Sequence, residues 1–295
     1  MAVAETTPRR TTGTRQAPLR RMWEGISVIF RSGVAVFGLV VILFWILVAI
    51  FAPVLAPHDP LAQDSAAINQ PPSSQYPLGT DNLGRDILSR LIYGSRTILL
   101  LAPISVACSV AVGTFLGLLG GYLGGLVDEV VMRILDSIMA FPTILLYLII
   151  IAAIGPSAIN VVVAITFVGA PGVARLVRSL TLDIRTRDYI RAAETRGENP
   201  LYIMFFEILP NARGPIIIDS MLRIGYAIFS IGTLGFLGLG LPPPTPDWGG
   251  MISEARKFIW TNPLGVLWPA LAISSLVVAL NLFADGLREE SMRYT

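Results

Sequence analysis

The chain has 295 residues, of which 54% are hydrophobic and 14% are charged, and its formal net charge is +2. Soluble domains carry about one quarter charged residues, so this composition places the chain in a lipid bilayer, and the small net charge argues against nucleic acid as a partner. Because Cys108 and His58 are the only residues of their kinds, an intramolecular disulfide, a cysteine-based metal site and a histidine cluster are excluded.

The N-terminal part of the sequence divides into a tail, a first membrane span and an external segment. Residues 1–21 are rich in Thr, Arg and Pro and lack apolar periodicity, so we predict a disordered tail. The uncharged run from Gly33 to Ala56 exceeds the roughly 20 residues that span a bilayer, and it is too long for the core of a cleavable signal peptide. We therefore expect residues 22–96 to hold an uncleaved span followed by an external segment.

The external segment contains a stretch with helical periodicity, residues 80–94. Its apolar residues Leu83, Ile87 and Leu91 share one face, which predicts a capped amphipathic helix. The charged residues expected to point away from that face are Arg85, Asp86 and Arg90. Such a helix can seat the next span at the membrane surface or bind a partner, and the periodicity leaves both functions open.

Five further spans are predicted in the core, residues 97–295. The uncharged run 97–126 carries glycines at intervals of four, which either let helix backbones approach closely or end the span. These are Gly113, Gly117, Gly121 and Gly125. A charged turn at 128–136 is expected to follow this second span.

The next uncharged run, 137–174, is too long for one span and is interrupted near its middle by Gly155, Pro156 and Ser157. We predict a tight hairpin of two spans there, at about 138–154 and 158–178. The fifth span is expected to begin near Pro215, and the sixth is expected at about 264–284.

Six spans put both termini on one side of the membrane, and the basic residues indicate which side. The opposite side receives Arg85, Arg90, Arg96, Arg256 and Lys257, and Arg223 lies within a span. The other sixteen of the 22 basic residues fall on the side of the termini and of the connection between spans four and five. By the positive-inside rule, that side is cytoplasmic.

The connection between spans four and five, residues 182–213, is rich in arginine and has its own helical pattern. Ala192 and Ala193 give a helix face with almost no side chain, and Gly197 permits a sharp bend after it. A segment of this kind has little use within lipid. We interpret it as a docking element for a cytoplasmic partner.

A second short helix is predicted after Gly197. Asn199 and Pro200 are typical of an N-cap and a first helical position. The apolar residues that follow recur at helical spacing, which predicts a helix lying on the membrane surface. They are Leu201, Met204, Phe205, Ile208 and Leu209.

The sequence contains no catalytic constellation. It has no Cys/His pair and no P-loop, so the chain is not expected to hydrolyse a nucleotide, and transport would take its energy from an ion gradient or a bound ATPase. Asp219 and Arg223 in the fifth span can pair on one helix face, either neutralising each other near the cytoplasmic end or lining a polar pathway. Because ion-driven carriers normally hold more ionisable groups in their spans, ion coupling is the weaker hypothesis.

The 182–213 connection resembles the EAA loop of importer permeases of the ATP-binding-cassette (ABC) class, which runs Glu-Ala-Ala, three residues, Gly, and later Leu-Pro. The residues in register with it are Ala192, Ala193, Gly197, Leu209 and Pro210. Arg191 replaces the Glu, and Glu207 stands where an apolar residue is usual. Two further stretches, 76–96 and 234–252, resemble signatures of the second permease subunit of dipeptide, oligopeptide and nickel importers.

The resemblance implies an all-α polytopic membrane protein with the type I ABC importer permease fold, in which six transmembrane helices carry a cytoplasmic coupling helix. It also implies a prokaryotic inner membrane, a second homologous permease subunit and an extracytoplasmic solute-binding protein. Two cytoplasmic ATPase domains or subunits would bind ATP and Mg, and no cofactor would bind to this chain. The residues implied at the ATPase contact are Arg187, Arg191, Ala192, Ala193, Gly197, Leu209 and Pro210.

Half of a translocation pathway for short peptides or similar polar solutes is therefore the expected function, with nickel or another solute as an alternative. The candidate pathway residues are Asp219 and Arg223. Gly235, Gly238 and Gly240 are expected at the external end of the pathway, where they also permit a close helix crossing. A self-sufficient channel, an ion-coupled carrier and a membrane scaffold remain as rival hypotheses.

Overall fold

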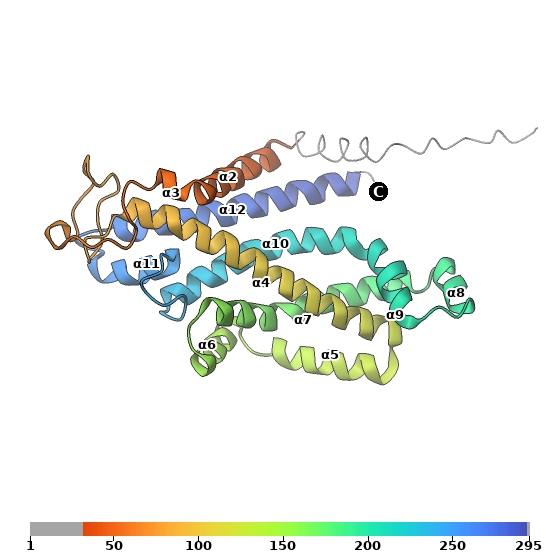
Figure 1. The fold of residues 1–295 in the computed structure, drawn as a ribbon. Coiled ribbons are helices and arrows are strands. Elements are labelled where there is room, and N and C mark those ends of the chain that lie inside the picture. The colour runs from red at the N-terminus through yellow and green to blue at the C-terminus, as the bar shows by residue number, and fades with distance from the viewer. Residues whose placement is uncertain (1–31, 294–295) are drawn as a thin grey trace, which may run out of the picture.

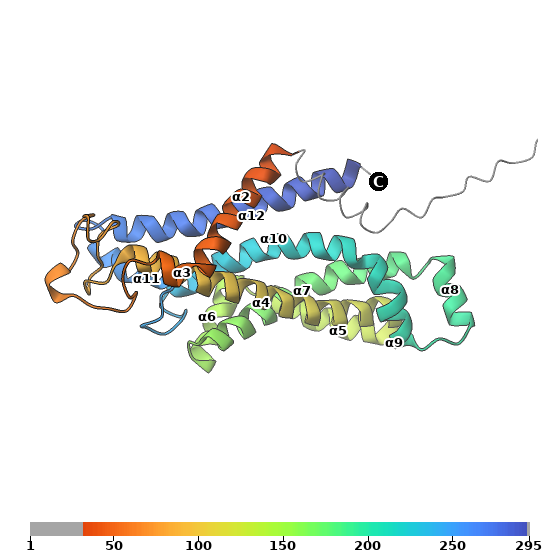
Figure 2. The same ribbon diagram turned by 45° about the horizontal axis from the view of Figure 1, so that its top comes forward.

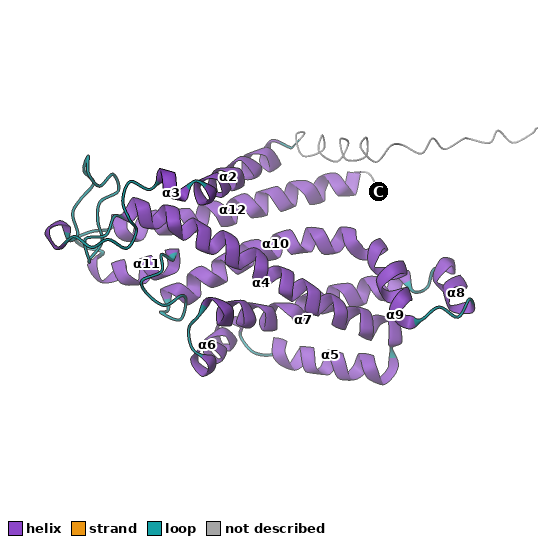
Figure 3. Cartoon of the chain, viewed as in Figure 1, coloured by secondary structure: helices purple, strands orange, loops and turns teal. Residues whose placement is uncertain are grey.

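The computed structural model describes residues 32–293, and within that range the chain consists of helices joined by loops (Figures 1 and 3). The α-helices are α2 (Gly33–Ile50), α3 (Ala52–Leu55), α4 (Ile87–Leu123), α5 (Gly125–Met139), α6 (Thr143–Ile154), α7 (Ala158–Ile184), α8 (Asp188–Thr195), α9 (Pro200–Tyr202), α10 (Leu209–Phe236), α11 (Trp248–Ala255) and α12 (Leu264–Arg293). Residues 65–67 and 256–258 form 3₁₀ turns, and residues 203–208 are π-helical. The predicted tail, residues 1–21, lies outside the described residues.

Five helical segments of the described chain are long and apolar enough to cross a bilayer: α2, α4, α7, the continuous helix Pro200–Phe236 and α12. Helices α5 and α6 together make a sixth candidate, bent by 91° between its two halves. The predicted all-α fold with six spans is therefore confirmed, with the third span divided into two helices.

The predicted hairpin of spans three and four is correct at its turn and wrong at its start. Gly155 has a φ of +87° and separates α6 from α7, as expected. Pro142, however, interrupts the helix expected at 138–154, because proline has no N–H and restricts the residue before it. As a result α6 has only 12 residues, and the charged stretch 128–136 belongs to α5 rather than to a turn.

The surface helix expected at 80–94 is wrong in its first half, which is a loop. Helix α4 begins at Ile87, where the carboxylate of Asp86 caps it by accepting the N–H of Ser89 at 2.9 Å. The second half of the stretch is continuous with the second span, so that α4 runs for 37 residues.

Helix α4 packs along α7 through its glycines. A methyl group at Gly113 would lie 2.6 Å from the carbonyl oxygen of Ala170, and one at Gly117 would lie 2.5 Å from that of Ala174. No side chain fits at such distances, so the two helices meet backbone to backbone. Gly124, with a φ of +66°, ends α4, so both of the functions considered for the glycines of this run are present.

Two apolar clusters fill the bundle. The larger includes Trp248 and Ile228 and lies among α4, α7, α10, α11 and α12. The smaller includes Ile190 and Val177 and lies beneath α8. The core is therefore divided between the α11 end and the α8 end of the molecule.

The ends of the described chain lie at the same end of the bundle as α8. Figures 1 and 2 show α8 at one extremity, with the end of α12 on the same side but short of it, and α11 with the 57–86 loops at the other extremity. The start of α2 packs against the end of α12, because a methyl group at Gly286 would lie 2.5 Å from the Cβ of Ala35. This arrangement is the one expected for six spans with the 182–213 connection on the side of the termini.

Candidate functional site

The candidate coupling helix is α8, which has eight residues and stands out at one end of the bundle (Figure 2). Ile190 and Ala193 are 0% exposed and pack into the smaller apolar cluster, whereas Ala192 is exposed. The prediction that Ala192 and Ala193 share one face is therefore wrong, since consecutive helical residues are about 100° apart. The small side chain of Ala193 lets α8 pack close to the bundle. Ala192 leaves the outer surface of α8 without a projecting side chain at that position.

Helix α8 ends at Gly197 in a Schellman motif. Gly197 has a φ of +77°, its N–H donates to the Glu194 carbonyl at 3.0 Å, and the Glu198 N–H donates to the Ala193 carbonyl at 3.2 Å. The side chain of Asn199 then caps the next helix by accepting a backbone N–H at 2.9 Å. The predicted bend and N-cap are both confirmed.

Helical structure continues without a break from Pro200 to Phe236, so the fifth span starts well before Pro215, where it was expected. Leu209 and Pro210 lie inside this helix. The Leu209 N–H donates to the carbonyl of Met204, five residues back, which is the spacing of a π-helix. Figure 1 shows the helix axis changing direction between α9 and α10, as expected where a proline follows a π-helical turn.

The apolar face of this segment is partly buried in protein, and its location on the membrane surface stays a prediction. Ile203, Met204 and Ile208 are at most 2% exposed, whereas Leu201 and Phe205 are 55% and 36% exposed. Ile203 was not expected on the face, because the π-helical turn holds an extra residue and rotates the side chains relative to an α-helical pattern.

Polar side chains tie α8 to the spans. The Tyr122 hydroxyl at the end of α4 donates to a Glu194 carboxylate oxygen at 3.2 Å. Arg185 donates to the carbonyl oxygens of Gly121 and Tyr122 at 3.2 and 3.0 Å. These carbonyls in the last turn of α4 have no partner further along the helix, and Arg185 supplies their hydrogen bonds. Sequence reasoning missed Tyr122, Arg185 and Glu194, because these contacts join residues more than 60 positions apart and have no local pattern.

The two arginines predicted at the ATPase contact are both exposed on this end of the molecule. Arg187 precedes α8 and pairs with Asp183 at 3.1 Å, with both side chains more than half exposed. Arg191 lies on α8 beside Ala192. Their contact with an ATPase stays a prediction.

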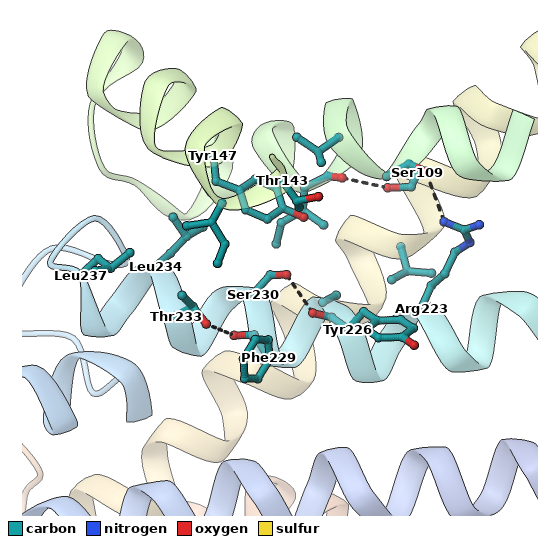
Figure 4. Close-up of a pocket in the computed structure, with 16 residues that line it drawn as sticks. Ser109, Thr143, Tyr147, Arg223, Tyr226, Phe229, Ser230, Thr233, Leu234 and Leu237 are labelled. Carbon is teal, nitrogen blue, oxygen red and sulfur yellow. Dashed lines mark hydrogen bonds between the residues drawn. The ribbon is translucent and has the colours of Figure 1, made fainter. Parts of the chain in front are cut away.

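Arg223 lies on a cavity of about 390 Å³ among α4, α6, α7 and α10 (Figure 4). Its Nε donates to Asp219, so the predicted pair is present. One terminal nitrogen, Nη1, donates to the Gly169 carbonyl of α7 at 3.3 Å. Arg223 lines the cavity and Asp219 does not, and the pair lies near the middle of the fifth span rather than near its α8 end, where one of the two interpretations had placed it.

The three glycines predicted at the external end of the pathway lie at and just after the end of α10. A methyl group at Gly235 would lie 2.9 Å from the backbone nitrogen of Gly250, and one at Gly240 would lie 2.6 Å from the Cα of Gly235. Gly238 has a φ of +80° and turns the chain. The close crossing, here with α11, is thus present, and the role of these residues in a gate stays a prediction.

Arg85 and Arg90, expected on the outer face of a surface helix, are instead buried. They form a cluster with Asp81 and with Glu254, whose side chain is 30% exposed (the buried ion cluster). Arg85 donates to Asp81 at 2.7 Å and to Glu254 at 2.6 Å, and Arg90 donates to Glu254 at 2.9 Å and also pairs with Asp81. Both arginine side chains are 3% exposed, whereas Leu83, expected to be buried, is 40% exposed. The cluster fastens the loop before α4 to α11.

Asp247 caps α11 and is buried next to the buried ion cluster. Its carboxylate accepts the N–H groups of Gly249 and Gly250 at 3.4 and 3.0 Å, and the residue is 3% exposed. Burial raises the pKa of Asp247 from 3.8 to about 6, although the two backbone hydrogen bonds and the charge of Arg90 oppose this. The folded protein therefore holds a proton on Asp247 more tightly than the unfolded chain does.

We expect Asp247 to make the stability of this end of the molecule depend on pH. The pKa of Asp247 is higher in the folded protein than in the unfolded chain. Its contribution to the free energy of unfolding, at most about 3 kcal/mol, is therefore fully present below pH 3.8 and is lost as the pH rises through about 6. Asp247→Asn keeps an acceptor for the cap and cannot ionise. The variant should therefore match the wild type near pH 4 and become more stable than it near pH 7, as measured by thermal unfolding in detergent across this range. A difference between the two proteins that is constant with pH would contradict the prediction.

Comparison with known proteins agrees with this architecture. A family described as "Binding-protein-dependent transport system inner membrane component" matches residues 113–289, and one described as "N-terminal TM domain of oligopeptide transport permease C" matches residues 18–72. The first match covers most of the chain, from the middle of α4 through α12. The chain belongs to this family of membrane components of binding-protein-dependent transport systems.

Similar proteins align with the chain over nearly its whole length. The dipeptide transport system permease protein DppC of Haemophilus influenzae is 41% identical over 280 residues, which are 93% of this chain and 94% of that protein. DppC of Escherichia coli strain K12 is 41% identical over 278 residues, or 92% of each chain. The glutathione transport system permease protein GsiD of Pectobacterium atrosepticum is 40% identical, over 93% of this chain and 90% of that protein.

Proposed function

We propose that this chain is one of two membrane subunits of an ATP-driven importer for short peptides, and that α8 couples the pathway to the ATPase subunits. Identity of about 40% across nine-tenths of dipeptide and glutathione permeases carries the proposal. Glutathione is itself a tripeptide, so the named substrates of these relatives share one chemistry.

The proposed partners are a homologous permease subunit, two cytoplasmic ATPase domains or subunits that bind ATP and Mg, and an extracytoplasmic solute-binding protein. The family description, which names a dependence on a binding protein, supports the last of these. The excess of arginine at the α8 end supports a cytoplasmic location for α8 and for both termini in a prokaryotic inner membrane.

The shape of the α8 end supports a mechanical coupling. Helix α8 is joined to the fourth span through Arg185 and Arg187 and to the fifth through the Gly197 turn. Tyr122 fastens it to the end of α4. When the ATPases close on ATP, a push on α8 would reach three spans together as a rigid-body displacement.

Purification and reconstitution test the proposal. The tagged chain should copurify with a second permease and with a P-loop ATPase. Vesicles that hold this complex should take up a labelled dipeptide only when ATP is on the side of the membrane that carries α8 and the binding protein is on the opposite side. Uptake by this chain alone without ATP would instead support a channel or an ion-coupled carrier and would refute the proposal.

A further inference from the structure

We propose that the cavity at Arg223 binds the carboxylate of a zwitterionic, peptide-like solute, an inference that rests on the function proposed above. The cavity lies among α4, α6, α7 and α10, and its volume of about 390 Å³ is within the range of small-molecule sites (Figure 4). It is lined by apolar and polar side chains in similar numbers. The polar ones are Ser109, Thr143, Tyr147, Arg223, Tyr226, Ser230 and Thr233.

The guanidinium of Arg223 has donors to spare. A guanidinium carries five N–H groups, of which one on Nε donates to Asp219 and one on Nη1 donates to the Gly169 carbonyl. The described structure leaves one N–H on Nη1 and two on Nη2. A charge-assisted hydrogen bond from one of these N–H groups to a carboxylate is about twice as strong as one between neutral groups.

The pose of Arg223 is fixed by its neighbours. Asp219 lies one turn earlier on α10 and holds Nε, while Gly169 of α7 holds Nη1. A methyl group at Gly172 would lie 3.1 Å from both Nη1 and Nη2, so this glycine lets the guanidinium lie against α7. A charged group in the middle of a span is costly, and one at the edge of a cavity is a candidate for binding a solute.

Charge balance favours a zwitterion over a simple anion. Arg223 and Asp219 together are neutral, so a lone anion would bring an uncompensated charge into the span. A peptide brings its own positive charge with its carboxylate. The site therefore suits a solute in which the two charges are a short distance apart.

Hydroxyl oxygens further along the cavity suit the donor end of such a solute. Ser230 and Thr233 donate their hydroxyl hydrogens to carbonyls of their own helix, at 2.9 and 2.8 Å. Ser109 does the same on α4 at 2.9 Å. Because these hydrogens are engaged, the hydroxyl oxygens face the cavity as acceptors, which amide and ammonium N–H groups require.

The spacing of the two ends fits a short peptide. Arg223, Tyr226, Ser230 and Thr233 all line the cavity and recur at helical spacing along α10. Seven residues of helix between Arg223 and Ser230 correspond to about 10 Å. An extended peptide of two or three residues spans at most about 7 to 11 Å.

A binding measurement on the complete transporter in nanodiscs tests the inference. The probes are the dipeptide alanylphenylalanine and its C-terminal amide, which lacks the negative charge. Arg223→Gln should weaken binding of the dipeptide at least about tenfold, the usual effect of losing a charged hydrogen-bond partner, and leave binding of the amide unchanged. Arg223→Lys should recover part of the loss, because an ammonium keeps the charge and has fewer N–H donors than a guanidinium.

The matched control is Arg175→Gln, which removes an arginine of α7 that pairs with Asp136 at 2.5 Å outside the cavity. It should bind both probes as the wild type does. Equal losses of dipeptide and amide in Arg223→Gln, or undiminished dipeptide binding, would overturn the inference, as would a wild type that binds neither probe. ATP-driven uptake by the same complex reports on the proposed function separately, since a transporter that imports peptide without this selectivity retains the function and lacks the site.

Discussion

Replacing Ala192 by glutamate is expected to reduce peptide uptake at least about tenfold while the ATPase subunits still hydrolyse ATP. Ala192 lies on the exposed side of α8, so a larger acidic side chain leaves the bundle unchanged and obstructs the surface proposed to meet the ATPase. A side chain central to an interface commonly contributes more than about 1 kcal/mol, and tenfold corresponds to about 1.4 kcal/mol. Uptake and ATP hydrolysis measured in the same vesicles give both halves of the result.

Two further variants, one at position 192 and one at position 193, separate an effect on coupling from an effect on folding. Ala192→Ser adds one small polar atom at the same exposed place and should transport normally. Ala193→Glu instead buries a charge in the smaller apolar cluster, because Ala193 is 0% exposed, and should lower the amount of folded protein. Normal uptake by Ala192→Glu would remove α8 from the proposed mechanism.

Asp81→Ala is expected to destabilise the α11 end of the molecule by about 3 to 5 kcal/mol. Asp81 accepts from both Arg85 and Arg90, so its loss leaves two buried arginines to share Glu254. Removing one partner of a buried ion pair has an effect of that size, because an uncompensated charge remains out of water. Thermal or denaturant unfolding of the purified complex in detergent measures the change.

The matched control for this variant is Glu129→Gln in α5. Glu129 pairs with Arg133 at 3.0 Å, one helical turn away, and their side chains are 59% and 78% exposed. Removing that charge should change stability by about 0 to 1 kcal/mol, because water solvates both partners. Similar losses for the two variants would show that burial of the ion cluster contributes nothing.

The membrane spans could be predicted from the sequence because lipid requires long uncharged runs, and this requirement is local. The same reasoning located the turn at Gly155 and the bend at Gly197, where the backbone needs a positive φ. The division of span three was missed, although Pro142 gave a signal, since composition alone makes 137–154 look like one continuous span.

The parts of the candidate site that could not be predicted depend on contacts across the fold. Arg85 and Arg90 look like solvated residues of an amphipathic stretch, and only Glu254, more than 160 positions away, explains their burial. The pairing of Asp219 with Arg223 was evident from their spacing, whereas the contact of Arg223 with Gly169 of α7 was not. The outward side of α8 was also unpredictable, because which alanine faces the bundle depends on what lies beneath it.

The glycine contact between α4 and α7 decides where the molecule can open. Two helices whose backbones touch at Gly113 and Gly117 cannot slide or roll past one another without steric clash, so they move together as one rigid body. Helix α10 packs far less extensively on that pair, and beside the cavity it is held to α7 by the Arg223–Gly169 hydrogen bond. The looser contact in the described bundle is therefore the one beside α10, and a solute path proposed there would have the α4–α7 pair as its fixed wall.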